Sequence, residues 1–390
     1  MSIMLLQGPL GPFFNKLQTS LELEGYDVHR FAFNGGDQFY GHSANIFNGK
    51  LSEWRKFFLK SIRNKHVSLV IAYGDCRALH IEAKRICQSE GVQYFALEEG
   101  YLRPNYITIE DGGVNGHSPI TRNGVLEYTP VHSPEDEVHV PGNFLRRIVY
   151  AIGYYGAGLI YRLRYSHYLH HRSFSAVYEP ACWIRAGFRK YLYKLTEPRT
   201  DALVKKGDFF LVPLQVHNDA QIQFHSAYDE MEDFIVGVME SFSYEQLSER
   251  LIFKHHPMDR GHVNYSKLIA KKAQELGLSD RVDYIHDQHL PTLLKHCKGV
   301  VTINSTTALQ AFYHRAAVKV MGDAFFDMEG LTYQGDLSSF WHDPIKPDAI
   351  FSDQFKAYLL DHGQINGSFY CQYSMTIRNL ISYLKKLKVI

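Results

Sequence analysis

The sequence predicts an α/β protein built from two doubly wound, Rossmann-type domains. With 390 residues, the chain is long enough for two domains that each have a full core. Strand-like and helix-like segments alternate over residues 3–97 and again over 208–321. Polar motifs follow apolar strand-like runs in both halves, at the positions where open α/β sheets present ligand-binding residues. One site shared by the two domains explains why the motifs are split between the halves.

The predicted N-terminal domain covers residues 1–120. The run from His66 to Tyr73 is continuously apolar, as a parallel strand buried on both faces requires. Gly25 and Gly91 each end a segment with helical spacing, as C-terminal glycines do. We expect strands at 3–6, 26–33, 66–73 and 92–97, and helices at 13–25 and 78–90.

The predicted C-terminal domain covers residues 206–345. Pro291 suits the first turn of a short helix, because that position needs no backbone N–H donor. We expect strands at 209–216, 251–253, 282–285, 299–303 and 317–321, and helices at 228–242, 265–276 and 308–314. Residues 346–390 complete the chain, and we expect helices there that cross back to pack on the N-terminal domain.

Between the two domains, residues 121–205 form a predicted helical insertion that is rich in arginine and tyrosine. Basic and aromatic side chains interleaved on helices suit a lipid headgroup interface. An ordinary insertion, with its aromatics in a core and its arginines in water, explains the pattern equally well. The side chains concerned are Arg146, Arg147, Arg162, Arg164 and Arg172, with Tyr150, Tyr154, Tyr155, Tyr161, Tyr165 and Tyr168.

Composition narrows the function classes. The 42 basic and 41 acidic residues nearly cancel, so no overall field attracts nucleic acid. The five cysteines are scattered and odd in number, which favours a reducing compartment over a disulfide framework. The N-terminus has no basic region ahead of its apolar residues, so we expect a first strand there and not a signal peptide. No apolar run approaches the roughly 20 residues of a membrane-spanning helix.

Two motifs of the C-terminal domain are candidate anion-binding elements, each at the end of a predicted strand. Hydroxyls and backbone N–H groups at a helix N-terminus bind anions, although a Ser/Thr cluster can also simply cap the helix. A histidine held in extended geometry by a following proline can donate to a phosphate or carboxylate, although a packed polar residue is the commoner case. The motifs are Lys254, His255, His256 and Pro257, and Asn304, Ser305, Thr306 and Thr307.

Two further motifs supply carboxylates. Glu98 and Glu99 close a predicted strand, and one of them can exchange a proton with a sugar hydroxyl; the alternative is a solvated acidic turn. Arg103 follows closely, and we expect it to pair with Glu99, which favours Glu98 as the proton-transfer group. Asp219, four residues after Gln215, is a candidate nucleophile or electrostatic partner, with an ordinary Asx turn as the alternative.

The loop Gly8-Pro9-Leu10-Gly11-Pro12 is glycine-rich, but its spacing misses both the P-loop and the dinucleotide fingerprint. We expect it to let an acceptor approach closely. Several histidines have ligand-like spacing without a matching Asp or Cys cluster, so we expect no metal site. They are His286 and His289, and His167, His170 and His171.

Together these motifs resemble those of the bacterial capsule polysaccharide biosynthesis proteins of the KpsS/LipB type, over nearly the whole chain. The resemblance is carried by 6–14, 33–37, 97–104, 213–216 with Asp219, 255–257 and 302–306. It implies a GT-B-like fold with an active-site cleft between its domains. It also implies a retaining β-Kdo transferase that moves Kdo from CMP-β-Kdo to a phosphatidylglycerol-type lipid, with no metal or other cofactor.

The resemblance also implies roles for individual residues. Ser305, Thr306 and His256 would hold the CMP phosphate, Asp219 would be the nucleophile, and Glu98 or Glu99 the acid/base group. The remaining donor-binding candidates are Gln215, Lys254, Pro257, Asn304 and Thr307, and the acceptor-binding candidates are Gly8, Gly11, Asn34, Asp37 and Arg103. We expect a cytoplasmic protein, peripheral on the inner face of the inner membrane, whose partners are an anionic lipid and other capsule biosynthesis proteins.

Two other functions fit the same motifs. The His-Pro and Ser/Thr motifs are also similar to those of bacterial sialyltransferases, which bind CMP through them, and the choice of sugar depends on a few pocket contacts. A non-catalytic capsule assembly or export factor is the third candidate. The clustering of acid, histidine and hydroxyl motifs at strand ends speaks against it.

Overall fold

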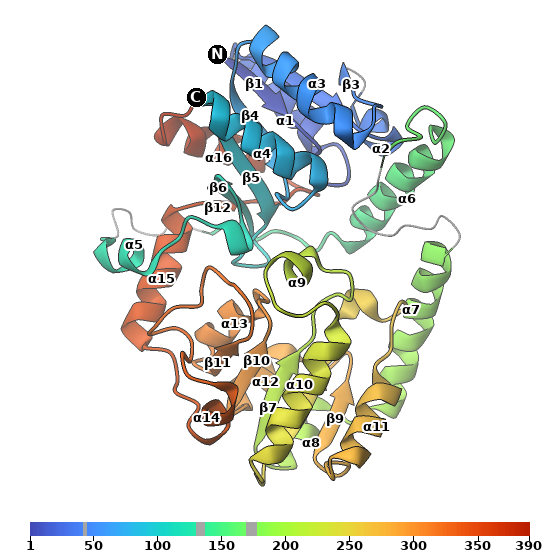
Figure 1. Cartoon of the computed structure of the whole chain (residues 1–390), viewed down its shortest axis with the longest axis vertical. Helices are drawn as coiled ribbons and strands as arrows, with labels where there is room; N and C mark the ends of the chain where they lie inside the picture. The colour runs from blue at the N-terminus through green and yellow to red at the C-terminus, as the bar shows by residue number, and fades with distance from the viewer. Residues whose placement is uncertain (42–44, 130–136, 169–177) are drawn as a thin grey trace. The chain divides into compact units, whose positions relative to one another are not determined.

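The computed structural model describes residues 1–41, 45–129, 137–168 and 178–390 (Figure 1). The chain forms two compact units. Unit 1 comprises Met1–Pro119, Thr129–Ser173 and Ala357–Ile390, and unit 2 comprises Ile120–Tyr128 and Phe174–Lys356. Each unit has its own largely parallel sheet, which confirms the predicted class of two doubly wound α/β bodies.

The units divide the chain differently from the four predicted segments. The segment predicted as one insertion, 121–205, contributes to both units, and the chain returns to unit 1 at Ala357. The reason is packing: helix α6 (Phe144–Ile160) lies against unit 1, whereas α7 (Tyr178–Thr196) lies against the loop at Arg260 and Gly261 of unit 2.

Unit 1 is built on a seven-stranded sheet with the order β12-β6-β5-β4-β1-β2-β3. The strands are β1 (Ser2–Leu5), β2 (Asp27–Ala32), β3 (Asn45–Ile46), β4 (Val67–Tyr73), β5 (Gln93–Glu99), β6 (Tyr106–Asp111) and β12 (Gln364–Asn366). The first five are parallel to one another, and β6 and β12 add an edge in which β5 pairs antiparallel with β6 and β6 antiparallel with β12. The sequence did not predict this edge.

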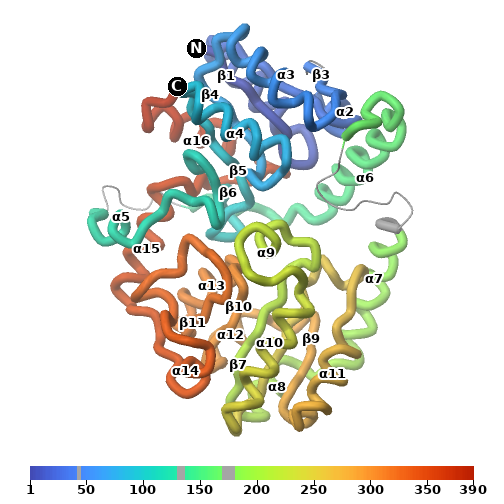
Figure 2. Tube along the Cα trace, viewed as in Figure 1, coloured from blue at the N-terminus to red at the C-terminus, as the bar shows by residue number. Residues whose placement is uncertain are grey.

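Helices cover both faces of the unit 1 sheet, because successive strand side chains point to opposite sides. Ile3 and Leu5 pack with α1 (Phe13–Leu23) and α16 (Tyr373–Lys386), whereas Met4 and Leu6 pack on the other face with α3 (Leu51–Asn64) and α4 (Ala78–Glu90). The C-terminal helix α16 therefore lies against the N-terminal helix α1 (Figure 2). The short helix α2 (Gly35–Phe39) also belongs to unit 1, whereas α5 (Arg122–Glu127) and α7 belong to unit 2.

Unit 2 contains a five-stranded, all-parallel sheet with the order β11-β10-β7-β8-β9. Its strands are β7 (Phe209–Pro213), β8 (Arg250–Lys254), β9 (Val282–Ile285), β10 (Gly299–Thr302) and β11 (Ala317–Val320). Helices α10 (Met231–Tyr244) and α11 (Ser266–Glu275) bury one face of this sheet. The other helices here are α8 (Thr200–Lys205), α9 (Ala220–Phe224), α12 (Leu290–His296), α13 (Thr307–Tyr313), α14 (Leu337–His342) and α15 (Ala349–Asp361), the last of which continues into unit 1.

Among the described helices, none combines the length and the apolar character that crossing a membrane would require.

Candidate functional site

The unit 2 sheet has a topological switch point between β7 and β10. From β7 the chain proceeds outward through β8 and β9, then returns to the other side of β7 to form β10 and β11. In open α/β sheets, ligands bind outside the carboxyl ends of the strands at such a point. The loops after β7, β8 and β10 carry three of the predicted motifs, and the structure therefore brings these motifs to one edge of one sheet.

An amide pair joins the two loops at the switch point. The Gln215 side chain donates through Nε2 to Asn304 Oδ1 at 2.9 Å, and its Oε1 accepts from the Asn304 backbone N–H at 3.2 Å. Gln215 Nε2 also lies 3.2 Å from Asp219 Oδ2. Both Gln215 and Asn304 are buried, so these contacts hold the loops in one arrangement.

Asp219 caps the N-terminus of α9. Its Oδ1 accepts from the Gln221 backbone N–H at 3.0 Å, as the Asx alternative predicted. With Gln215 on the second oxygen, the carboxylate is fixed in one orientation while the residue stays half-buried. Capping and chemistry are compatible here, because an oriented and partly accessible carboxylate is what a nucleophile or charge-stabilising group needs.

The three hydroxyls after β10 are half-buried and differ in their contacts. Ser305 Oγ accepts from the Thr307 backbone N–H at 3.2 Å and donates to Thr307 Oγ1 at 3.0 Å, so Ser305 does the capping. The Thr306 hydroxyl makes no hydrogen bond with any residue that the structure describes. The cluster therefore has more hydroxyl capacity than the cap of α13 uses.

Lys254 and His255 are structural residues of this edge. The buried Lys254 Nζ donates to the backbone oxygen of His286 at 2.9 Å, and burial lowers the pKa of its ammonium group. His255 is 1% exposed, its Nδ1 lies 2.7 Å from the Tyr284 hydroxyl, and burial lowers its pKa to about 4. A neutral, enclosed imidazole of this kind orders the strand end.

His256 differs from its neighbour because it is half-buried and begins the turn Pro257–Asp259. Its Nδ1 accepts from the Met258 backbone N–H at 3.2 Å, which assigns the ring proton of the neutral form to Nε2.

Asp259, which the sequence analysis did not select, links the β7 and β8 loops. This 1% exposed carboxylate accepts from the backbone N–H of His217 at 2.5 Å and faces His217 Nδ1 at 2.8 Å. His217 and Asp259 each lie close to a selected motif, yet only the parallel pairing of β7 with β8 shows that they meet. Because β8 and β10 flank β7, His256 and Ser305 follow strands about 10 Å apart.

In unit 1, the two glutamates at the end of β5 have separate environments. Glu99 Oε1 accepts from the Tyr370 hydroxyl at 3.0 Å and lies 3.7 Å from Arg147 Nη2, and the Arg147 guanidinium stacks 4.6 Å from the centre of the Tyr370 ring. The expected Glu99–Arg103 pair is therefore wrong: Arg147 of α6 takes that place, and Arg103 Nε donates to the Gly100 backbone oxygen at 3.2 Å.

Glu98 has the more reactive environment. Its Oε1 accepts from the Glu99 backbone N–H at 3.0 Å, and burial raises its pKa to about 7, assisted by the charge of Glu99. A carboxyl group with a pKa near neutrality can both take and return a proton at physiological pH. Glu98 is thus the better acid/base candidate of the pair.

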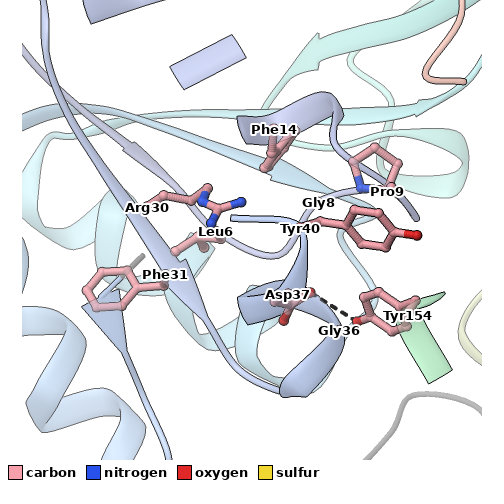
Figure 3. Close-up of a pocket in the computed structure, with 11 residues that line it drawn as sticks. Leu6, Gly8, Pro9, Phe14, Arg30, Phe31, Gly36, Asp37, Tyr40 and Tyr154 are labelled. Atoms are coloured by element: carbon pink, nitrogen blue, oxygen red, sulfur yellow. Dashed lines mark hydrogen bonds between the residues drawn. The ribbon is translucent and has the colours of Figure 1, made fainter. Parts of the chain in front are cut away.

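Asn34 and Asp37 belong to one hydrogen-bond network, and Figure 3 shows its bond between Asp37 and Tyr154. Asn34 caps α2 by accepting from the Asp37 backbone N–H at 2.9 Å. Asp37 accepts from the Tyr154 hydroxyl at 3.0 Å and from Gln7 Nε2 at 3.0 Å, and burial raises its pKa. The neighbouring Arg30 is 5% exposed and donates to the Gly41 backbone oxygen. The network joins α6 to the loops after β1 and β2, which carry predicted acceptor residues.

The glycines of these motifs allow close packing of α6. A Cβ on Gly35 would lie 2.3 Å from the Ala157 backbone oxygen, and one on Gly36 would lie 2.3 Å from the Tyr154 ring. Likewise, a Cβ on Gly11, which has φ +99°, would lie 2.7 Å from the Tyr150 ring, and one on Gly8 would lie 2.7 Å from Phe14. These glycines build the scaffold of the site.

Comparison with known proteins identifies the family. Residues 68–370 match the family model described as capsule polysaccharide biosynthesis protein. The chain belongs to this family. It is 42% identical over 374 residues to the capsule polysaccharide export protein KpsS of Escherichia coli, covering 94% of this chain and 96% of that relative. It is 38% identical over 387 residues to the capsule polysaccharide modification protein LipB of Neisseria meningitidis serogroup A, covering 95% and 92%.

A solved structure is similar along the whole chain. The KpsC beta Kdo 2,7 transferase of Thermosulfurimonas dismutans matches with a TM-score of 0.50, at 14% sequence identity and with 100% of both chains covered. At this identity the likeness concerns the fold, and it confirms the predicted GT-B-like class.

Proposed function

We propose that this chain is a retaining glycosyltransferase that moves Kdo from CMP-β-Kdo to a phosphatidylglycerol-type lipid, without a metal ion. The main support is that Gln215, Asn304 and Asp259 join three polar loops at the switch point of the unit 2 sheet. Kinship with KpsS and LipB and the fold of a Kdo transferase support the same assignment.

In this proposal, unit 2 binds the donor. His256 Nε2–H and the Thr306 hydroxyl donate to the CMP phosphate, and the Ser305 hydroxyl joins them by turning its proton away from Thr307 Oγ1. Phosphate oxygens take charge-assisted hydrogen bonds from such groups. Asp219 attacks the anomeric carbon, the bond from that carbon to the phosphate oxygen breaks, and CMP leaves with the electron pair. An acceptor hydroxyl then displaces Asp219 while Glu98 takes its proton. Two displacements retain the configuration.

The test is to measure CMP release from CMP-β-Kdo with and without phosphatidylglycerol vesicles. We expect lipid-dependent release together with a Kdo-lipid product detected by mass spectrometry. Release with CMP-sialic acid but not with CMP-β-Kdo would favour the sialic-acid type of transferase. No release with either donor would favour the third candidate, a non-catalytic assembly or export factor of the kind that the name of KpsS suggests.

We also propose that the protein works at the inner face of the inner membrane, where other capsule biosynthesis proteins are its partners. The support is the outward face of α6 and the turn after it. Its large apolar side chains are between 57% and 90% exposed and recur with helical spacing, which is unusual for a water-facing helix. They are Leu145, Val149, Ile152, Leu159, Ile160 and Leu163.

The charges and the tyrosines of this segment have separate roles. Arg146, Arg162 and Arg164 are exposed, and no acidic residue occurs between 144 and 168, which suits an anionic surface. The tyrosines face inward instead: Tyr154 and Tyr165 are buried, as the core alternative for the aromatics predicted. Arg172, His170 and His171 lie outside the described residues.

Vesicle flotation tests this attachment. Changing Val149, Ile152 and Leu159 to serine should reduce binding to phosphatidylglycerol vesicles, and changing Arg146, Arg162 and Arg164 to glutamine should reduce it by about 1 kcal/mol per charge. Because all six side chains are exposed, the fold should be preserved. Unchanged flotation of both variants would contradict attachment through this segment.

A further inference from the structure

Unit 1 contains a cavity of about 160 Å³ beside the Asn34–Asp37 network. Its residues come from the loops after β1, β2, β3 and β4, from the first turns of α3 and α4, and from the turn after α6. The unit 1 sheet has its own switch point between β1 and β4, because β2 and β3 extend it on one side and β5 on the other. The cavity therefore lies where an open α/β sheet binds a ligand.

One wall of the cavity is cationic. Arg77, between β4 and α4, is half-buried and makes no hydrogen bond or ion pair with any residue that the structure describes. Its guanidinium stacks at 5.5 Å from the centre of the Tyr73 ring, which orients it without using its five donors. Asp37 and Glu98 lie within electrostatic range, but Asp37 already accepts from Gln7, Tyr154 and the Phe33 backbone N–H, and no hydrogen bond or ion pair joins Arg77 to either carboxylate. The Arg77 donors therefore remain available.

Another part of the lining is apolar. Phe33 and Phe47 are nearly fully buried, and Leu51 and Leu79 complete the surface. Trp54 stiffens this wall from behind, since its Nε1–H donates to the Leu79 backbone oxygen at 2.8 Å and its ring packs 4.9 Å from that of Phe47. Leu51 is 44% exposed, so it can be covered by a bound molecule.

We propose that this cavity binds an anionic amphiphile, with its phosphate on Arg77 and its hydrocarbon against Phe33, Phe47, Leu51 and Leu79. An arginine fork matches a phosphate group in two parallel hydrogen bonds, and the apolar wall excludes ligands that are charged throughout. His167 lines the same cavity and can contact the head group. The inference rests on the proposed function only in taking this amphiphile to be the acceptor.

The experiment is calorimetric titration of the full chain with monomeric dihexanoyl-phosphatidylglycerol, glycerol 3-phosphate and inorganic phosphate, in the absence of a donor sugar. We expect the amphiphile to bind at least about tenfold more tightly than either head-group probe, since only it covers the apolar wall. Arg77→Gln should weaken amphiphile binding by about tenfold to a hundredfold. Arg85→Gln, on the exposed side of the same helix, is the matched control and should bind like the wild type.

A second variant distinguishes loss of binding from loss of folding. Leu51→Asp places an acidic residue at the first position of α3, where it suits the helix dipole, yet it opposes an anion and removes apolar contact. It should fold normally and still lose affinity. Equal affinities for Arg77→Gln and wild type, or equal binding of phosphate and amphiphile, would overturn the inference. Because no donor is present, either result leaves the transferase proposal to its own CMP-release test.

Discussion

The two units hold polar motif residues at the same kind of sheet edge but use them differently. In unit 2, loops after three parallel strands bond directly to each other through Gln215–Asn304 and His217–Asp259. In unit 1, Asn34 and Asp37 turn inward and bond to a tyrosine of α6, a helix inserted far away in the sequence.

This difference separates residues that build a site from residues that act in it. Asn34, Lys254 and His255 are buried, Asp37 is half-buried, and all four have protein partners, so their contribution is mainly structural. In another set, each residue makes a local structural contact and still has a donor, an acceptor or a titratable group for a ligand. These residues are the better candidates for ligand contact. They are Asp219, His256, Thr306, Glu98 and Arg77. Single substitutions can test whether the structural role and the chemical role of such a residue are separable.

The largest effect is expected at Asp219. Replacement by alanine should reduce turnover by about a thousandfold or more, because a covalent nucleophile cannot be replaced by a neighbour. Asp219→Asn is the matched variant, since asparagine caps helices as well as aspartate does but is not a nucleophile. Both variants should lack activity in the CMP-release assay, and only the alanine variant should also lose about 1 kcal/mol of stability. An active Asp219→Asn enzyme would refute the double displacement.

Glu98→Gln should reduce transfer by about a hundredfold or more, the usual contribution of a general acid/base group. Wild-type activity should rise with pH through about 7, the pKa to which burial raises Glu98, because the base must be ionised. The variant should lose this limb of the profile and accumulate a sugar adduct on Asp219, visible by intact-protein mass spectrometry.

Stability gives an independent check on Glu98. Its folded-state pKa is raised above the ordinary value, so the folded state holds the proton more tightly and stability falls as pH rises from about 4.5 to about 7. Glu98→Gln should remove this loss and raise the melting temperature at pH 8 more than at pH 5. Glu99→Gln is the comparison: it removes the charge that faces Arg147 and weakens the acceptor for the Tyr370 hydroxyl, so it should cost stability and affect turnover less.

The sequence was sufficient for elements with local signals. The strand over Val282–Ile285 and the helix over Ala78–Glu90 occur at the predicted residues, and the two-sheet class is confirmed. Helix α3 was missed although Trp54, Phe58 and Ile62 repeat every four residues and are buried. The antiparallel edge was missed for another reason: β12 has three residues and pairs with β6 across more than 250 positions, which no local pattern records.

The site, like the fold, was predictable from local sequence signals only. Motif residues at strand ends could be selected because the carboxyl ends of parallel strands meet at one edge. Their partners could not be selected. Arg147 reaches Glu99 only because α6 packs on unit 1, and His217 meets Asp259 only because β7 lies beside β8. Long-range packing determines these pairs, so the sequence led instead to the nearby Arg103.

A smaller effect is expected at His256, in binding and not in chemistry. His256→Ala should weaken CMP binding by about tenfold, the value of one hydrogen bond to a charged group, and should destabilise the turn Pro257–Asp259. His256→Asn keeps a side-chain acceptor for the Met258 N–H but lacks the Nε2–H donor. Calorimetry should show similar loss of CMP affinity in both variants, with normal stability in the asparagine variant only. Wild-type affinity in both would exclude His256 from the nucleotide site.

The smallest effect on transfer is expected from a change in the Asn34–Asp37 network, whose role is structural. Gly36→Ala would place a Cβ 2.3 Å from the Tyr154 ring, so α6 must shift, and we expect a loss of about 1–3 kcal/mol in unfolding free energy. Gly156→Ala is the matched control: it lies on α6 itself, its Cβ would meet no atom within 4 Å, and alanine favours a helix by about 1 kcal/mol over glycine. The denaturant midpoints should therefore shift in opposite directions for the two variants.

Because Arg147 on the same helix contacts Glu99, Gly36→Ala should also reduce transfer modestly while leaving CMP affinity in unit 2 unchanged. If CMP affinity fell as well, the nucleotide site would depend on this network. The distinction between residues that support the site structurally and residues that contact the ligand would then be wrong.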